Sequence, residues 1–466
     1  MEKLAMTRTI VRGGTIVTPE GTFSGDVVIE GEKIAEVTEK AESRPDDTVI
    51  EAEGLLVLPG IVDAHTHIML DTGIYKTADN WLVGTRTAAA GGVTTVVDFA
   101  TQFPGQSFRE AVENRWAEAQ DAIVDYALHC MVTELPIGSE DSLRTLIEMG
   151  LPSFKIYTTY RPNYYMDDAT ILRLMRKAVE IGGLVIVHAE NDAMVTEATE
   201  HLVNTGRTGW QYHPLSRPPE AEQEAVNRIL FLARLADAPV YIVHCTTGLS
   251  VELVRNARQA GQPAWCETCP QYLLLDDRVY RSEHPEHYIL QPPIRPAGEP
   301  EKLWKLVSEG AVSLISTDSC DYTLEQKREF TEFTKTPGGL PGIETLLPLV
   351  YTYGVDKGRM DLTDMVRLLC ENPARLFGLA PRKGFLKPGS DADLVLYDPG
   401  VEKEIHHEDL HYLAGYSPYE GMGVKGEVRM TFSRGEVIYR DGEILGTAGR
   451  GQFVPGKPFS VDVMET

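Results

Sequence analysis

The middle of the chain, from about residue 56 to residue 318, alternates short apolar segments with amphipathic ones. The apolar segments have the length and composition of buried strands and span residues 56–65, 94–100, 125–134, 153–157, 184–189, 240–245, 264–268 and 312–318. Helical patterns lie between them, at residues 79–90, 107–122, 168–181, 219–236, 249–261 and 299–309. Eight strands that alternate with helices over about 260 residues predict a (β/α)8 barrel.

An open, doubly wound sheet would show a similar alternation. No Gly-x-Gly-x-x-Gly motif follows the first strand of the middle section, where a dinucleotide-binding sheet of that kind would carry it. This absence favours the barrel over the open sheet.

Both ends of the chain differ from the middle in their sequence pattern. Short β-branched segments that Gly and Asp interrupt fill residues 7–55 and recur after residue 389. We therefore expect an α/β protein in which residues 56–380 form the barrel, while residues 1–55 and 381–466 together form one small β-sandwich domain. A length of 466 residues suits one large barrel plus such an accessory domain.

Charge and cysteine content narrow the class of protein. The chain has 44 Lys and Arg against 69 Asp and Glu, and its net charge of −25 argues against a nucleic-acid partner. No apolar run approaches the roughly 18 residues of a membrane span, and the N-terminus, Met1-Glu2-Lys3-Leu4, lacks the apolar core of a signal peptide. The six cysteines show no disulfide framework, and Cys266-x-x-Cys269 has no second pair that would complete a zinc ribbon. We expect a reduced, cytoplasmic protein.

Ligand-type residues stand at the ends of five predicted strands, where a (β/α)8 barrel carries its catalytic groups. The first strand runs into His65 and His67, whose i, i+2 spacing places both imidazoles on one face of an extended chain. The later strand ends carry Lys155, His188, His244 and Asp318. Packing alone does not explain this concentration of histidine, lysine and aspartate.

These residue types suit a site for two metal ions. Neutral imidazoles and a carboxylate are good ligands for Zn²⁺, and four histidines with one aspartate exceed the needs of one catalytic ion that keeps an open position. Lys155 can complete such a site if its amine reacts with CO2, because the carbamate offers two oxygens that can bridge two ions. A salt bridge inside the barrel is the alternative role for Lys155.

Two metal ions about 3.5–4 Å apart would lower the pKa of a bridging water and polarise a carbonyl oxygen. Asp318 could bind one ion with one oxygen, take the proton of the water with the other, and pass that proton to a leaving nitrogen. The residues therefore predict amide hydrolysis by a bridging hydroxide, with Asp318 as general base and acid and without a covalent enzyme intermediate.

Further motifs extend along nearly the whole chain: Thr77-Ala78-Asp79-Asn80-Trp81, Phe154-Lys155-Ile156-Tyr157, Val187-His188-Ala189-Glu190-Asn191, Glu267-Thr268-Cys269-Pro270-Gln271 and Gly389-Ser390-Asp391-Ala392-Asp393-Leu394. As a set they resemble the cyclic-amidase branch of the amidohydrolase superfamily, which contains dihydropyrimidinases, hydantoinases and allantoinases. The resemblance implies an enzyme that opens the cyclic amide ring of hydantoins or dihydropyrimidines to N-carbamoyl amino acids. It also implies a homo-oligomer, either a homotetramer or a homodimer.

The resemblance assigns roles to individual residues. Tyr160 matches the tyrosine that stabilises the developing oxyanion. Gln291 and Gly338 fall where the family binds the imide edge of its substrate through backbone groups. Six positions correspond to the ligands of two divalent ions, for which we expect Zn²⁺: His65, His67, Lys155 as N6-carboxylysine, His188, His244 and Asp318.

Alternatives within and outside enzyme function remain. The segment from Gly338 to Thr345 resembles allantoinases or dihydroorotases, but no arginine follows His67 to hold the carboxylate of a dihydroorotate. Ser319 stands where the family usually has a histidine, which leaves the tuning of Asp318 open. Scaffold proteins related to dihydropyrimidinase have lost metal ligands, whereas all six ligand positions are filled here.

The loops after the first and fourth strands carry apolar and aromatic side chains that we expect around the ring substituent. These residues are Ile68, Met69, Leu70, Ile74, Tyr157, Tyr164, Tyr165 and Met166. Such a rim suits a neutral or aromatic substituent, because an anionic one would lose hydration without gaining a partner.

Overall fold

The computed structural model describes residues 8–464, so the N-terminal Met1-Glu2-Lys3-Leu4 stretch lies outside the described residues. Eight parallel strands form one sheet in the order of the sequence, from β6 to β13. A parallel bridge between Thr66 and Ser319 joins the first and last strand ends, and His67 N–H donates to the Ser319 carbonyl at 2.8 Å. The predicted (β/α)8 barrel is confirmed, and the doubly wound sheet is excluded because each strand pairs with its neighbour in sequence.

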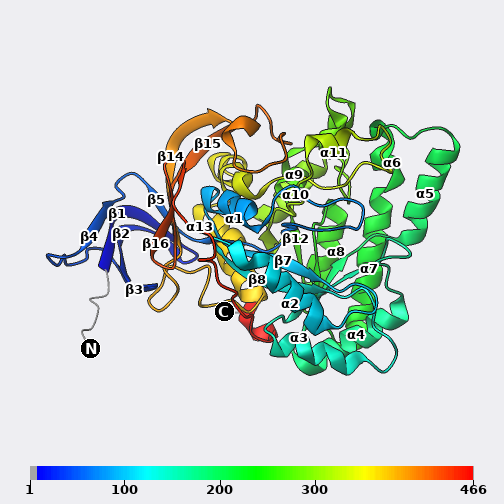
Figure 1. Cartoon of the computed structure of the whole chain (residues 1–466), viewed down its shortest axis with the longest axis horizontal. Helices are drawn as coiled ribbons and strands as arrows, with labels where there is room; N and C mark the ends of the chain where they lie inside the picture. Colours follow the sequence, from blue (N-terminus) through cyan, green and yellow to red (C-terminus); the bar gives the residue numbers. More distant parts are fainter. Residues whose placement is uncertain (1–7, 465–466) are drawn as a thin grey trace.

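The strands of the barrel are short and buried along their length. Their bounds are β6 Ile61–Asp63, β7 Val93–Thr101, β8 Asp125–Met131, β9 Ser153–Tyr157, β10 Leu184–His188, β11 Val240–Ile242, β12 Ala264–Thr268 and β13 Leu314–Ile315. The helices that cover them include α1 Trp81–Ala90, α2 Phe108–Glu118, α4 Asp168–Ile181, α5 Asp192–Asn204, α7 Pro219–Ala236, α8 Gly248–Gln259 and α10 Glu299–Ser308. In Figure 1 the helices α4, α5, α7 and α8 lie on the side of the barrel away from the terminal strands.

Helix α4 shows why the sequence specifies these elements. The Asp167 carboxylate accepts a hydrogen bond from Thr170 N–H at the start of the helix, and Gly182 ends it in the left-handed conformation with φ 74°. Ile171, Leu174 and Ala178 recur at helical spacing and are buried. The cap, the stop and the apolar stripe all agree with the predicted range.

The first predicted strand, residues 56–65, is two strands in two different sheets, so this prediction is wrong in detail. Strand β5 (Leu56–Pro59) pairs with β1 and β14 of the second sheet, whereas β6 belongs to the barrel. The break falls at Gly60, whose N–H donates to the Asp393 carbonyl at 2.9 Å. A Cβ there would lie 2.2 Å from the Thr94 side chain, so only glycine fits this crossing point.

The second sheet contains strands from both ends of the chain, as predicted. It runs in the order β17-β16-β15-β14-β5-β1-β2-β3, and β4 pairs with β1. Its strands are β1 Arg8–Thr18, β2 Gly21–Glu30, β3 Lys33–Thr38, β4 Thr48–Glu51, β14 Leu394–Glu404, β15 Gly423–Ser433, β16 Glu436–Arg440 and β17 Glu443–Ile444. The division of the chain at residues 55 and 380 stays a prediction.

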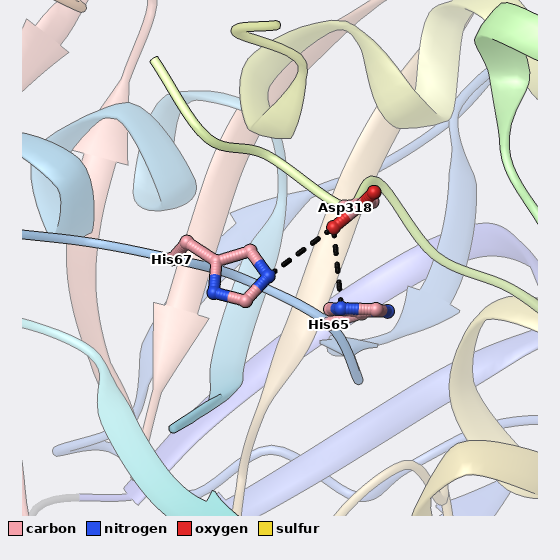
Figure 2. Close-up of side chains that lie close together, drawn as sticks. All are labelled: His65, His67 and Asp318. Atoms are coloured by element: carbon pink, nitrogen blue, oxygen red, sulfur yellow. Dashed lines mark ion pairs between the residues drawn. The ribbon is translucent and has the colours of Figure 1, made fainter. Parts of the chain in front are cut away.

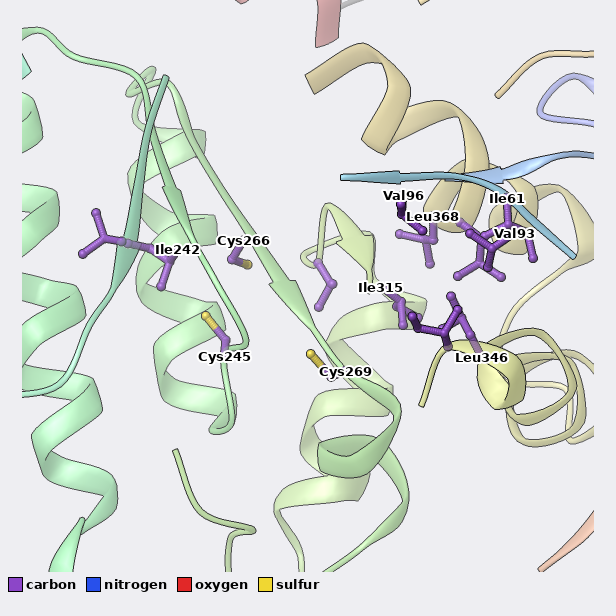
Figure 3. Packing of buried hydrophobic residues seen from close by; sticks show 14 of the residues in the cluster. Ile61, Val93, Val96, Ile242, Cys245, Cys266, Cys269, Ile315, Leu346 and Leu368 are labelled. Carbon is purple, nitrogen blue, oxygen red and sulfur yellow. The ribbon is translucent and has the colours of Figure 1, made fainter. Parts of the chain in front are cut away.

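The main core lies between the barrel strands and the surrounding helices. Figure 3 shows Ile61, Val93 and Val96 gathered against Leu346 and Leu368. Cysteines take part in the same packing, because Cys245, Cys266 and Cys269 are buried in this cluster. All six cysteines are free and buried. Within residues 8–464, no helix is both long and apolar enough to cross a membrane.

A buried ion cluster joins the barrel to the second sheet. The Lys383 ammonium lies 2.5 Å from an Asp125 oxygen at the start of β8 and 2.8 Å from oxygens of Asp391 and Asp393. Burial alone would lower the pKa of Lys383, but the three carboxylates raise it above its ordinary value. Arg434 of the second sheet also donates to Asp125 at 3.1 Å.

Candidate active site

A cavity of about 560 Å³ opens at the carboxyl ends of the barrel strands. All nine residues predicted for the site line it: His65, His67, Lys155, Tyr160, His188, His244, Gln291, Asp318 and Gly338. They come from strands and loops that are up to about 270 residues apart in the sequence, and the closed barrel brings them together.

His65, His67 and Asp318 form the tightest group in the cavity. The Asp318 Oδ1 atom lies 3.1 Å from His65 Nε2 and 3.3 Å from His67 Nε2, as Figure 2 shows. The three ligand-type atoms lie within 4.8 Å of one another, which suits one metal ion. His65 Nε2 is buried and makes no hydrogen bond with any described residue, so a cation would satisfy its lone pair.

The second nitrogen of His65 is held by Glu267 of β12. His65 Nδ1 donates to Glu267 Oε1 at 2.5 Å, which leaves Nε2 as the nitrogen that faces the cavity. The Glu267 carboxylate also accepts from Tyr241 Oη at 2.6 Å, from Ser316 Oγ at 2.7 Å and from His244 N–H at 3.1 Å. A carboxylate behind a histidine fixes its tautomer and orientation, as second partners of metal ligands commonly do.

A carboxylate also holds His188, but it binds the other ring nitrogen, Nε2. Its Nε2 atom lies 2.7 Å from Glu190 Oε2, which leaves Nδ1 free for the cavity. Burial alone would raise the pKa of Glu190. The Arg217 guanidinium donates to both of its carboxylate oxygens, and together with His188 it lowers the pKa of Glu190 below its ordinary value.

The His244 ring lies 4.6 Å from the His188 ring. Burial lowers the pKa of His65, His188 and His244, so these histidines are in the neutral form that binds metal ions.

Lys155 projects from β9 into the same cavity and is 1 % exposed. Its ammonium makes no hydrogen bond or ion pair within the described part of the chain, and it lies 5.3 Å from the centres of the Phe99 and Tyr157 rings. Burial lowers its pKa to about 8 in spite of the nearby carboxylates of Asp318 and Glu267. A lysine with a lowered pKa carries more of the neutral amine, which is the form that reacts with CO2.

Tyr160 lies in the loop after β9, and its ring is 5.2 Å from the His188 ring. Burial raises the pKa of Tyr160, so the phenol keeps its proton and can donate a hydrogen bond. Its backbone has φ 74°, and His244 and Asp318 also have positive φ values of 38° and 51°. Strained backbone at three cavity residues is typical of a site whose side chains are aimed for function.

Gln291 and Gly338 lie next to each other in the wall of the cavity. A Cβ at Gly338 would lie 1.8 Å from the Gln291 side-chain oxygen, so the Gln291 side chain would have to move if another residue stood at position 338. Gly339 N–H donates to the Ile289 carbonyl at 2.9 Å, so the two backbone segments lie side by side where the sequence predicts contacts with the substrate.

Several supporting residues were not predicted from the sequence. Asp98 accepts hydrogen bonds from Thr66 Oγ1 at 3.0 Å and Ile68 N–H at 2.8 Å, and so fixes the residues on both sides of His67. Arg115 in turn donates to Asp98 at 2.5 Å. Glu190 and Glu267 occur in the motifs above, but their role depends on partners distant in the sequence. A buried carboxylate near a predicted strand end is the only signal that could have found them.

The structure changes part of the predicted rim. Leu70, Ile74, Tyr157 and Tyr164 line the cavity, and Tyr75, Tyr322 and Phe330 join them without having been predicted. Ile68 and Met166 are buried elsewhere, and Met69 lines a separate small cavity behind Phe99, because the loop turns at Met69 with φ 54°. Tyr165 stacks instead on the Arg161 guanidinium, 3.5 Å from its ring centre.

Ser319, which takes the place of a histidine, forms hydrogen bonds with the backbone of two other segments. Its Oγ accepts a hydrogen bond from Gly342 N–H at 3.2 Å, and its carbonyl closes the barrel against His67. It thereby fixes the segment next to Asp318 by backbone contacts.

A second group of ligand-type residues lies outside the cavity, at His284, Glu286 and His287. Arg328 donates to Glu286 at 2.8 Å and contacts His284 Nδ1 at 3.2 Å. A guanidinium already occupies the position that a cation would need.

Comparisons with known proteins agree with the geometry. The profile described as Amidohydrolase family matches residues 56–438. A D-phenylhydantoinase from Escherichia coli O1:K1 / APEC is 40% identical over 462 residues, which cover 98% of this chain and 100% of that protein. The solved dihydropyrimidinase from Brevibacillus agri NCHU1002 superimposes with a TM-score of 0.95 at 36% identity, covering 97% of this chain and all of the other. The L-hydantoinase (dihydropyrimidinase) from Arthrobacter aurescens gives 0.90 at 30% identity, with the same coverage of both chains.

Proposed function

The chain belongs to the amidohydrolase family, and we propose that it opens the ring of hydantoins or dihydropyrimidines to give N-carbamoyl amino acids. One observation carries this proposal. Six side chains able to bind metal ions, of which five are buried and Asp318 is partly buried, converge in one cavity with the Tyr160 phenol and the segments at Gln291 and Gly338. This arrangement suits a substrate that has both a scissile amide bond and an imide edge.

We propose that two divalent ions, Zn²⁺, bind in this cavity. Unpaired imidazole nitrogens, fixed in orientation by Glu267 and Glu190, support this fit. The ligands would be His65, His67, Lys155 as its carbamate, His188, His244 and Asp318. When bound, the ions would lower the pKa of a water towards neutrality and polarise the carbonyl of the substrate.

The carbamate on Lys155 requires only CO2. The neutral amine attacks the carbon of CO2, an N–C bond forms, and the nitrogen releases a proton to solvent. The product is an anion with two oxygens in place of a cation, and it would remove the positive charge that now faces three histidines and Asp318. The lowered pKa of Lys155 and its lack of an ion-pair partner within residues 8–464 support this modification.

Asp318 and Tyr160 would act on the reacting atoms. The Asp318 carboxylate, held between His65 and His67, would accept the proton of the attacking water and deliver it to the leaving ring nitrogen. The Tyr160 phenol would donate a hydrogen bond to the oxygen that gains negative charge. Arg217 lies 4.9 Å from the Tyr160 ring centre and restricts its position.

The rim of the cavity supports a neutral or aryl substituent on the ring. Tyr157, Tyr164 and Leu70 offer no positive charge to an anionic group. Lys335 also lines the cavity, but its ammonium is paired with Glu332 at 3.0 Å. This composition disfavours the polar substituent of allantoin and the carboxylate of dihydroorotate. The filled ligand positions and the open cavity disfavour a scaffold protein without catalysis.

A panel of substrates tests the proposed function. The purified enzyme should open aryl- and alkyl-hydantoins and dihydrouracil, detected as N-carbamoyl products by mass spectrometry, faster than allantoin or dihydroorotate. Failure to open any hydantoin or dihydropyrimidine would refute the proposal, and a preference for allantoin would transfer it to the allantoinases.

Two wider properties are also part of this proposal. Phe231 and Leu235 lie one helical turn apart on α7 and are 54% and 64% exposed, which supports a homo-oligomer, as a tetramer or dimer. Light scattering measures that state directly. The six free cysteines support a reducing compartment, the cytoplasm.

A further inference from the structure

Lys327 lies directly behind the wall of the cavity that carries Gln291 and Gly338. It belongs to the short helix α11 (Leu324–Arg328) and is fully buried, although it does not line the cavity. Its Nζ donates to the Ile289 carbonyl at 2.7 Å and to the Pro337 carbonyl at 2.8 Å. One side chain therefore joins the two segments proposed to bind the imide edge.

The surroundings of Lys327 indicate a role beyond hydrophobic packing. Within residues 8–464 it forms no ion pair, so the backbone carbonyls are the acceptors that replace its hydration. Burial lowers its pKa to about 7, while Cys320 and Glu286 act in the opposite direction. A buried amine without a carboxylate is costly, and an apolar residue would fill the same space at lower cost.

Other contacts hold the same two segments in register. Gly339 N–H donates to the Ile289 carbonyl at 2.9 Å, so this carbonyl accepts from both Gly339 and Lys327. His213 Nε2 donates to the Leu290 carbonyl at 2.7 Å. Lys327 is the member of this network that contacts both segments through one atom. Without it, the Gly339–Ile289 hydrogen bond still joins the two segments, but the Pro337 carbonyl loses its link to Ile289 and the spacing of the segments is less restricted.

We propose that Lys327 is a positioning residue for substrate binding, which sets the spacing of the Gln291 and Gly338 backbone groups that receive the imide edge. This inference rests on the proposed function. The imide nitrogen is the leaving nitrogen, but it keeps its N–H while its bond to the carbonyl carbon breaks. The backbone groups that hold this edge therefore bind the ground state and the transition state alike. Loss of Lys327 should therefore raise KM more than it lowers kcat.

The test compares Lys327→Met and Lys327→Arg with the wild-type holoenzyme on one hydantoin. Lys327→Met removes both hydrogen bonds at similar length, and KM should rise about tenfold or more, with kcat changed less and with unchanged metal content. Lys327→Arg keeps donors for the two carbonyls and should recover most of the loss. Lys305→Met, on the exposed part of α10, is the matched control and should behave as wild type.

A hydantoin methylated at the imide nitrogen adds a readout that a merely structural role would not change. The methylated nitrogen is also the leaving nitrogen, so the comparison uses KM and not kcat. The methyl group removes the N–H of the imide edge, so it should raise the wild-type KM and should raise the KM of Lys327→Met less. Wild-type KM in Lys327→Met, or an equal methyl penalty in both proteins, would overturn the inference. Failure of both Lys327 variants to fold would do the same, because it would assign Lys327 to global stability. A wild-type enzyme that opens no ring would instead refute the proposed function.

Discussion

At the scale of single residues, carboxylates behind the cavity decide what the histidines can do. Glu267 takes Nδ1 of His65, and Glu190 takes Nε2 of His188, so different nitrogens face inward in the two rings. The sequence predicts which histidines gather but not which nitrogen each one presents. That choice depends on hydrogen bonds between residues as far apart as 65 and 267, which no local pattern encodes.

The prediction for Lys155 follows from its isolation. Lys155→Ala should lose the bound metal ions and nearly all activity, because no other described side chain supplies a bridging anion at that position. Short carboxylic acids should restore part of the activity by occupying the vacated space. Metal analysis and turnover, with and without acetate or propionate, measure both effects. A Lys155→Ala enzyme with near-normal turnover and two ions would contradict the carbamate.

Tyr160 should act mainly after the substrate is bound. Tyr160→Phe removes a donor that meets charge only in the transition state, so kcat should fall by about 10²- to 10³-fold while KM changes little. Steady-state kinetics on one hydantoin give the two constants. Tyr212→Phe, a tyrosine outside the cavity, is the control. An effect on KM alone would place the phenol in ground-state binding.

At the scale of elements, the sequence predicted regular pieces well and crossing points poorly. The predicted ranges 153–157, 264–268, 168–181 and 219–236 match β9, β12, α4 and α7. Helix α4 has a capping residue at each end, and α7 begins at Pro219 and ends before Asp237, which is in the left-handed conformation. The strand at residues 56–65 was predicted as one element because the apolar run continues through Pro59 and Gly60, although its two halves belong to different sheets.

The loops after β6 and β9 set the choice of substituent, and the structure locates the residues that decide it. Leu70 and Tyr157 line the cavity, whereas Met69 points into a different space. Leu70→Ala or Tyr157→Ala should change the ranking of substituted hydantoins by about 1–3 kcal/mol in kcat/KM, because each removes apolar surface beside the substituent. Met69→Ala is the matched control and should keep the ranking. If Leu70→Ala and Tyr157→Ala also keep it, the rim is wrongly assigned.

At the scale of the whole molecule, the two sheets are held together by buried charge as well as by packing. Lys383 contacts Asp125 of the barrel and two aspartates of the Gly389-Ser390-Asp391-Ala392-Asp393 motif. Burial alone would raise the pKa of Asp391, but Lys383 and hydrogen bonds from Lys33 and Arg382 lower it to about 2. The motif is visible in the sequence, but its lysine partner is not.

Lys383→Met should destabilise the protein. Asp125 keeps Arg434, and Asp391 keeps Lys33 and Arg382, but the buried Asp393 carboxylate loses its ion-pair partner, and breaking such a cluster costs roughly 3–5 kcal/mol. Burial already raises the pKa of Asp393 and Lys383 opposes this, so without Lys383 the pKa of Asp393 in the folded protein would rise further above the unfolded value of about 3.9. The loss of stability caused by the mutation is then present above the unfolded pKa, and it disappears as the pH falls through the pKa of the carboxyl in the folded protein. The difference in Tm from wild type should therefore narrow from about pH 7 to about pH 5.

Thermal unfolding of wild type, Lys383→Met and the surface control Lys305→Met at both pH values checks this sign. A Tm difference that stays constant or widens at the lower pH would show that the cluster does not act through charge.

If the cavity holds two metal ions that are needed to open a cyclic imide, activity must depend on both. Metal is removed from the purified enzyme and Zn²⁺ is returned in steps, while the hydantoin-opening rate is recorded against the number of ions bound per chain. Activity should rise until two ions are bound and then stay level. Full activity with one ion per chain, or undiminished activity in the metal-free protein, would show that two ions are not required.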